Sequence, residues 1–170
     1  MVLQIHPENP EGRKIKKVIE VLENDGVIIY PTDTVYGLGC DIFNKRAVER
    51  ICRIRGLDPK KAQLSFICES ISQVAEYAAQ IDNEVFRLMK RRLPGPYTFI
   101  LKASSRVPRL IQTRRATIGV RVPDNNIPLE IVRALGRPIL TTSLKNDDEI
   151  LEYFTEVADF APEFEPLVDV

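Results

Sequence analysis

Apolar residues recur along the chain with two spacings, one typical of helices and one typical of short buried strands. The apolar residues between Ile15 and Leu22 follow an i, i+3, i+4, i+7 spacing and predict a helix over 11–25. The run 27–30 is short, apolar and β-branched, and Pro31 ends it because proline has no backbone N–H to donate to a neighbouring strand. The sequence therefore opens with a helix and a buried strand.

The same two patterns alternate through the rest of the chain. Further helices are predicted over 44–56, 82–93, 127–135 and 149–159, and further strands over 64–68, 97–102, 117–122 and 139–142. Asn44 is predicted to cap its helix, and Val85, Phe86, Leu88 and Met89 mark the apolar positions of the helix over 82–93. Helices that alternate with short apolar strands predict an α/β fold whose mixed β-sheet carries the site at its polar strand ends.

Length and composition predict one soluble domain, 1–170. The 170 residues are 44% hydrophobic and 28% charged, which suits a single globular core. The longest apolar runs fall far short of the roughly 20 residues that cross a bilayer, and residues 1–10 lack the order of a signal peptide. Three cysteines leave one unpaired and show no short ligand spacing, so we expect buried reduced thiols. These features favour a cytoplasmic protein.

Charge is balanced overall but uneven along the chain. Lys and Arg number 24, as do Asp and Glu, yet 147–170 holds nine acids and no base, which leaves 24 bases against 15 acids in 1–146. Between Arg87 and Arg121 ten basic residues occur and no acid. Two interpretations stay open: a solvated basic face, or a concave surface for phosphates or nucleic acid.

Several common catalytic motifs are absent from the sequence. It contains no phosphate-binding loop of the G-x-x-x-x-G-K-[ST] kind, no complete G-x-G-x-x-G and no G-x-S-x-G. The single histidine, His6, excludes a metal site built on two histidines, and it lies in a polar stretch where a surface role is favoured. We therefore expect no catalytic nucleophile and no dedicated protein metal site.

The stretch 31–39, PTDTVYGLG, places two hydroxyls, a carboxylate and a phenol directly after a buried strand. Its glycines allow the backbone to approach a ligand, and the hydroxyls of Thr32 and Thr34 can donate to carboxylate or phosphate oxygens. The alternative is a tight turn in which Thr32 and Asp33 satisfy local backbone groups. Both interpretations stay open at this point.

Three further polar ends of elements are expected to meet this loop: Arg53 with Arg55, Thr117 with Arg121, and the hydroxyl run 141–143. Cations and hydroxyls together suit an anionic ligand. The first arginine pair fits complementation of a helix dipole equally well. Arg121 interrupts an apolar strand, so it needs a buried anionic partner or a ligand, and we favour the ligand.

Five segments of the sequence resemble a known family. They are PTDTVYGLGCD at 31–41, AVERICRIRG at 47–56, PGPYTFILK at 94–102, TIGVRVP at 117–123 and PILTTSL at 138–144. In this order they resemble the YrdC-like threonylcarbamoyl-AMP synthase family. The sequences RICRIR and TSL within them resemble its YciO branch. The resemblance implies a twisted α/β sheet around a basic concave cavity.

The resemblance also implies a reaction and its participants. It joins L-threonine, bicarbonate and ATP into threonylcarbamoyl-AMP and pyrophosphate for transfer-RNA modification, with Mg²⁺ carried on the ATP phosphates. By position in the motifs, the residues near threonine would be Thr32, Arg121 and Thr141. Those on the nucleotide side would be Arg55, Lys61, Thr117 and Ser143, of which Ser143 fits a helix cap equally well.

Two departures from the family pattern bear on activity. Leu57 stands where a second cation is usual, unless Arg53 and Arg55 substitute by a shift of register, and Lys145 stands where the family has an asparagine. The alternatives are a non-catalytic protein that binds a nucleotide or structured double-stranded RNA in the same cavity, or an interaction protein whose acidic segment 147–170 folds over the basic face or recruits a partner to it. We expect the family's closing C-terminal strands to be missing, and a homodimer stays open.

Overall fold

A computed structural model of the chain describes residues 1–58, 64–111, 116–144 and 156–170. The helices are α1 (Gly12–Glu23), α2 (Lys45–Ile54), α3 (Ile71–Tyr77), α4 (Asn83–Arg92), α5 (Asn126–Leu135) and α6 (Val157–Phe164), with a short 3₁₀ turn at Arg109–Ile111. The strands are β1 (Ile28–Tyr30), β2 (Gly37–Asp41), β3 (Ser65–Ile67), β4 (Phe99–Lys102), β5 (Thr117–Arg121) and β6 (Ile139–Ser143).

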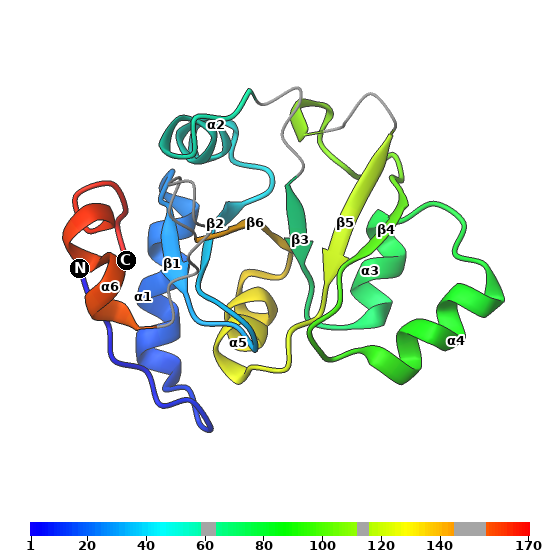
Figure 1. Cartoon of the computed structure of the whole chain (residues 1–170), viewed down its shortest axis with the longest axis horizontal. Helices are drawn as coiled ribbons and strands as arrows, with labels where there is room; N and C mark the ends of the chain where they lie inside the picture. The colour runs from blue at the N-terminus through cyan, green and yellow to red at the C-terminus, as the bar shows by residue number, and fades with distance from the viewer. Residues whose placement is uncertain (59–63, 112–115, 145–155) are drawn as a thin grey trace.

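The strands form one mixed sheet in the order β1-β2-β6-β3-β5-β4. The pairing is antiparallel everywhere except between β3 and β5, which run parallel. Helices flank this sheet, so the predicted α/β fold with a mixed sheet is confirmed (Figure 1).

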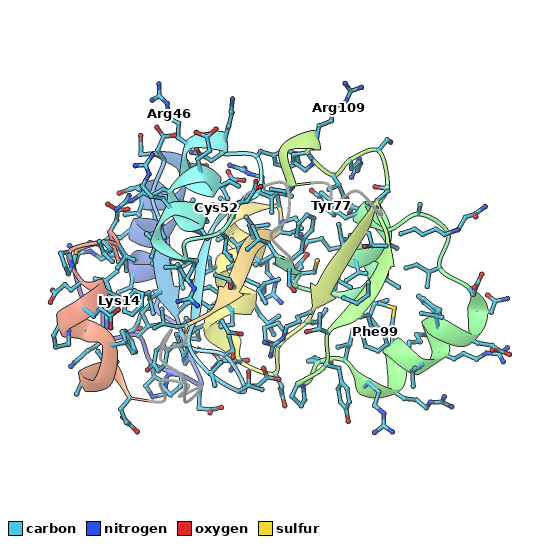
Figure 2. The ribbon with its side chains drawn as sticks, turned by 45° about the horizontal axis from the view of Figure 1, so that its top comes forward. Lys14, Arg46, Cys52, Tyr77, Phe99 and Arg109 are labelled. Atoms are coloured by element: carbon cyan, nitrogen blue, oxygen red, sulfur yellow. The ribbon has the colours of Figure 1, made fainter. Side chains whose placement is uncertain are left out.

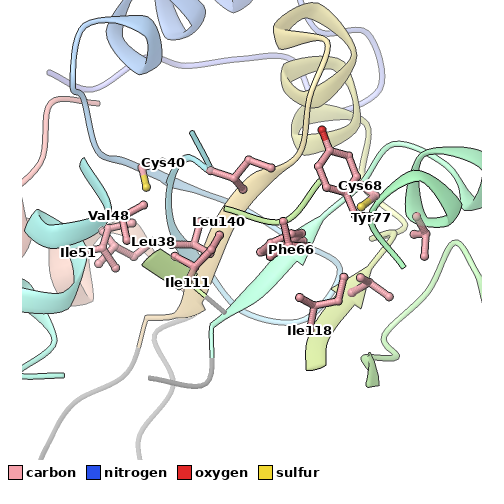
Figure 3. Close-up of a cluster of buried hydrophobic side chains, with 14 of the residues drawn as sticks. Leu38, Cys40, Val48, Ile51, Phe66, Cys68, Tyr77, Ile111, Ile118 and Leu140 are labelled. Carbon is pink, nitrogen blue, oxygen red and sulfur yellow. The ribbon is translucent and has the colours of Figure 1, made fainter. Parts of the chain in front are cut away.

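Each face of the sheet carries its own hydrophobic core, because successive strand residues point to opposite faces. On one face, α1 and α5 cover Ile28, Tyr30, Ile67 and Ile139. We call this the α1/α5 face. On the other, α2 and α3 pack with Leu38, Leu140 and Phe66, as the close-up in Figure 3 shows for the labelled side chains. The strands are thus fixed from both sides.

Two elements are missing from the sequence prediction. β2 lies inside the stretch predicted as a loop, because glycine at two of its five positions lowers its strand propensity. The seven-residue α3 begins after Ser70, whose side chain accepts a hydrogen bond from the backbone N–H of Gln73 at 3.2 Å. So short a helix shows little apolar periodicity.

The predicted cap and thiols are found as expected, whereas the apolar face of α4 is not. The Asn44 side chain accepts from the Ala47 N–H at 3.1 Å, and the three cysteines are buried and unpaired. In α4, however, Met89 is fully buried while Phe86 and Leu88 are 37% and 39% exposed. The helix predicted over 149–159 falls mostly outside the described residues, and α6 overlaps only its end.

The termini and α4 lie at opposite ends of the molecule (Figure 1). Close to α6, the C-terminal residues run along β1, where the Ile29 N–H donates to the Val170 carbonyl at 2.8 Å. Figure 2 shows Arg46 and Arg109 extending away from the ribbon along one edge. Among the described residues, no helix is long and apolar enough to span a bilayer.

Candidate functional site

A cavity of about 230 Å³ opens on the α1/α5 face of the sheet, beside the part that the two helices cover. It is lined mainly by hydroxyl side chains and contains one cation among its described residues. The lining residues are Thr32, Val35, Tyr36, Gly37, Ser65, Thr98, Arg121, Thr141, Thr142 and Ser143. The expected basic cavity is, in its described part, a polar cavity with a single guanidinium.

Tyr30 lies behind the cavity lining, where its ring crosses β2 to reach Thr141 of β6. A Cβ atom at Gly37 would lie 2.9 Å from the Tyr30 hydroxyl oxygen, and one at Gly39 would lie 2.8 Å from Cε1 of the ring. The hydroxyl donates to Thr141 Oγ1 at 2.5 Å. Both glycines make room for the tyrosine ring, and Gly37 also lines the cavity, so its predicted role beside a ligand stays a prediction.

The centre of the cavity floor depends on a third glycine in the same way. Ser65, Gly119 and Thr141 are cross-strand neighbours, and a Cβ at Gly119 would lie 2.7 Å from Ser65 Oγ and 3.2 Å from Thr98 Cγ2. Gly119 therefore leaves room for the side chains of Ser65 and Thr98, both of which line the cavity.

Arg121 lines the cavity and is held by the loop between β1 and β2. Its Nη2 donates to Asp33 Oδ1 at 2.9 Å and to Thr34 Oγ1 at 3.2 Å. The Arg121 and Asp33 side chains are only 14% and 9% exposed. Of the two possibilities that the sequence left for Arg121, the structure shows the less favoured one, a buried anionic partner, which is Asp33. Nε of Arg121 is nevertheless buried without a hydrogen-bond partner among the described residues.

The loop is itself a tight turn, as one of the two interpretations predicted. Thr32 Oγ1 donates to the Val35 carbonyl at 2.6 Å and accepts from the Thr34 N–H at 3.1 Å. Asp33 Oδ2 accepts from the Asp124 N–H at 3.1 Å, so the loop is tied to the segment that follows β5. Thr32 therefore faces the cavity with its proton already used inside the turn.

Tyr36 closes the loop side of the cavity. Its ring packs against Phe160 of α6 with the centroids 4.9 Å apart, and its carbonyl accepts from the Leu144 N–H at 2.9 Å. Burial, with Glu156 nearby, raises the pKa of the Tyr36 phenol, so this wall stays neutral at physiological pH.

Of the seven residues predicted from the sequence, four lie together in this cavity. Thr32, Arg121, Thr141 and Ser143 all line it. Arg55 ends α2 and is 8% exposed, and Thr117 is at the far end of β5 from Arg121; neither is in the cavity lining. Lys61 and Lys145 lie outside the described residues.

Leu57, which stands at the position of the family's second cation, does not line the cavity, and neither does Arg53, which could substitute for that cation. Leu57 is 38% exposed, Arg53 is exposed on α2, and both are absent from the described lining. In the described part of the cavity, Arg53 therefore does not replace the missing cation by a shift of register.

Ser65, Thr98 and Tyr36 line the cavity but were not singled out as ligands. The sequence around Ser65 predicts an ordinary buried strand. Only the pairing of Ser65 with Gly119 places its side chain in the cavity floor. Thr98 precedes β4 after the turn Pro94-Gly95-Pro96, a signal that predicted the turn and not the direction of the hydroxyl.

The lining offers neutral donors and one guanidinium, which suits a small anion. No carboxylate is among the described lining residues, and the described part of the chain holds no cluster of three metal-binding side chains.

Comparison with known proteins places this geometry in a family. The family model Sua5/YciO/YrdC, described as "Telomere recombination", matches residues 20–170. The protein YciO of Escherichia coli is 50% identical over 141 residues, covering 82% of this chain and 68% of that protein. A threonylcarbamoyl-AMP synthase of Methylobacillus flagellatus is 36% identical over 129 residues, covering 76% and 71%.

Solved structures agree with the sequence relatives. The crystal structure of E. coli YciO matches with a TM-score of 0.88 at 44% identity over 97% of this chain and 79% of that one. Sua5 of P. abyssi, crystallised with L-threonine, matches with a TM-score of 0.86 at 28% identity over 99% and 49%. The chain therefore belongs to the Sua5/YciO/YrdC family.

Proposed function

We propose that this protein is a nucleotidyltransferase that joins L-threonine, bicarbonate and ATP into threonylcarbamoyl-AMP and pyrophosphate, for the modification of transfer RNA in the cytoplasm. The observation that carries the proposal is the guanidinium of Arg121, with its unpartnered Nε, at the edge of a hydroxyl-lined cavity. The threonylcarbamoyl-AMP synthase among its relatives, and the Sua5 structure with L-threonine, support it.

The size of the cavity supports different places for the amino acid and the nucleotide. About 230 Å³ lies below the roughly 300–1,000 Å³ of pockets that enclose drug-sized ligands. We assign the amino acid to the cavity, with its carboxylate on Arg121 and with Thr32 and Thr141 beside it. MgATP then lies at the mouth, on the side of Ser143. Roles for Arg55, Lys61 and Thr117 on the nucleotide remain predictions, and neither Arg55 nor Thr117 lines the described cavity.

The chemistry needs positioned charges and no protein nucleophile. The threonine amine forms an N–C bond with bicarbonate, which loses water to give a carbamate. A carbamate oxygen then attacks the α-phosphorus of ATP, and the bond to the β-phosphate breaks to release pyrophosphate. Charge develops on oxygens throughout, and hydroxyl and guanidinium donors fixed in a polar cavity stabilise it.

The first experiment measures pyrophosphate release from MgATP in the presence of bicarbonate and labelled L-threonine, and looks for the labelled mixed anhydride. We expect release to need both co-substrates. Arg121→Ala should raise the Kd for threonine at least about tenfold, because a charge-assisted hydrogen bond to the carboxylate is lost.

Arg137→Ala is the matched control for this experiment. Arg137 also forms an ion pair with an aspartate, donating from Nη2 to Asp41 Oδ2 at 2.6 Å, but it is absent from the cavity lining. It should leave the Kd for threonine unchanged wherever the variant is folded. Unchanged threonine binding in Arg121→Ala, or pyrophosphate release that ignores threonine, would refute the proposal.

Binding of structured RNA is a second candidate function, and one observation favours a surface for it. Lys90, Arg91 and Arg92 are basic residues in the last turn of α4, and the Arg92 guanidinium carbon lies 5.5 Å from the centre of the Tyr97 ring. Exposed cations with an aromatic ring suit a nucleic-acid backbone and its bases. These residues are not among those lining the cavity, so we propose the two activities for separate surfaces.

A further inference from the structure

The buried pair of Tyr30 and Thr141 carries a role that cavity position alone does not assign. Tyr30 is 2% exposed, and its hydroxyl is 2.5 Å from Thr141 Oγ1. Gly37 and Gly39 lack the Cβ atoms that would block the tyrosine ring. Three positions on two strands thus deliver one phenol oxygen to one threonine.

The direction of this hydrogen bond decides where the Thr141 proton goes. Burial raises the pKa of the Tyr30 phenol, so the phenol keeps its proton. A hydroxyl has a single proton to donate. If Thr141 donated to Tyr30, the phenol proton would be left buried without an acceptor, at a cost of about 1–3 kcal/mol.

Tyr30 is therefore the donor and Thr141 the acceptor, which leaves the Thr141 proton free. Thr141 Oγ1 has no other hydrogen-bond partner among the described residues, and the side chain lines the cavity. Its proton can therefore be satisfied by a ligand, and the matching ligand atom must be an acceptor. An ammonium group cannot take up that proton, because it has only donors.

We propose that Tyr30 is a positioning residue that turns the Thr141 hydroxyl into a dedicated donor for an anionic oxygen of the amino-acid substrate. The oxygen belongs to the carboxylate or to the carbamate formed on the amine. This inference rests on the proposed function for the identity of the ligand, and it adds a residue that reaches the substrate only through Thr141.

The test is a double-mutant cycle on Tyr30→Phe and Thr141→Val. For each variant, the Kd of L-threonine is measured by calorimetry and kcat/KM for threonine by pyrophosphate release. We expect Tyr30→Phe to weaken binding or kcat/KM about 3- to 10-fold and Thr141→Val about 10-fold or more. The double variant should be no worse than Thr141→Val, because the phenol acts only through that hydroxyl.

Two further variants separate positioning from a general loss of packing. Thr141→Ser keeps the hydroxyl, so it should stay close to the wild type and remain sensitive to Tyr30→Phe. Tyr77→Phe removes another buried phenol, 5% exposed and on the opposite face of the sheet, and should leave threonine binding unchanged.

The outcomes distinguish this inference from the proposed function. An effect on Kd assigns the oxygen to the carboxylate, and an effect on kcat/KM without a change in Kd assigns it to the carbamate. Additive effects of the two substitutions, or no effect of Tyr30→Phe in a wild type that binds threonine, overturn the inference alone. A wild type that binds no threonine overturns the proposed function and this inference together.

Discussion

The Arg121 guanidinium contacts the loop between β1 and β2 and also lines the cavity. Asp33 and Thr34 both accept from Nη2, which leaves Nε and Nη1 outside the contacts to the loop. A buried ion pair of this kind holds its partners in place, and breaking it by removing one side leaves an uncompensated charge. Asp33 therefore orients the arginine that we assign to the substrate carboxylate.

This role makes Asp33→Asn a sensitive substitution. The neutral amide loses the charge opposite Arg121 and cannot satisfy both the guanidinium and the Asp124 N–H as the carboxylate does. We expect the free energy of unfolding to fall by about 1–3 kcal/mol in urea titrations.

Asp25→Asn is the control for that measurement. Asp25 also pairs with an arginine, Arg46, but the two side chains are 46% and 83% exposed. An exposed pair contributes little, so the change should stay within about 0.5 kcal/mol. Equal losses in the two variants would contradict the role given to burial around Asp33.

At the scale of elements, β2 shows why glycine-rich strands are hard to recognise. Its two glycines face the Tyr30 ring, which belongs to the neighbouring strand. This reason is non-local, so no pattern within residues 31–41 contains it. The other strands, which are β-branched and apolar, were predicted to within a few residues.

Gly39→Ala tests this account of β2. The new methyl group would lie 2.8 Å from the Tyr30 ring and 3.1 Å from the Leu140 carbonyl oxygen, so the ring or the strand must move. We expect a loss of about 1–3 kcal/mol in the free energy of unfolding, measured by denaturant titration.

Gly12→Ala provides the same substitution where space is open. No atom lies within 4 Å of a Cβ at this position in the first turn of α1. It should be neutral or slightly stabilising, by up to about 0.5 kcal/mol. If Gly39→Ala proved equally harmless, the ring would not occupy the space assigned to it.

The candidate site divides along the same line between local and non-local signals. Thr32, Arg121, Thr141 and Ser143 stood out because hydroxyls or a cation interrupt apolar patterns, and they lie in one cavity. Ser65 and Thr98 carry no such local signal. Only the strand order, which sets β3 between β6 and β5, brings them to the cavity.

At the scale of the whole molecule, the bases of residues 1–146 that the structure describes are not concentrated in the cavity. Arg121 is its one described cation, whereas α4 ends in three exposed bases at the opposite end of the molecule from α6 (Figure 1). We therefore propose different parts of the surface for a phosphate-bearing polymer and for a small amino acid.

Charge reversal on α4 tests this separation. We expect the double substitution Arg91→Glu and Arg92→Glu to weaken binding of a short double-stranded RNA. It should also lower the salt dependence of the affinity, because a protein that makes fewer phosphate contacts releases fewer counterions on binding. The Kd for threonine should stay within about twofold, since neither residue lines the cavity. Arg121→Ala should raise the Kd for threonine and leave RNA binding unchanged in the same two assays. RNA binding that Arg121→Ala abolishes and the α4 variant leaves intact would instead place the RNA in the cavity, and the division of surfaces would be wrong.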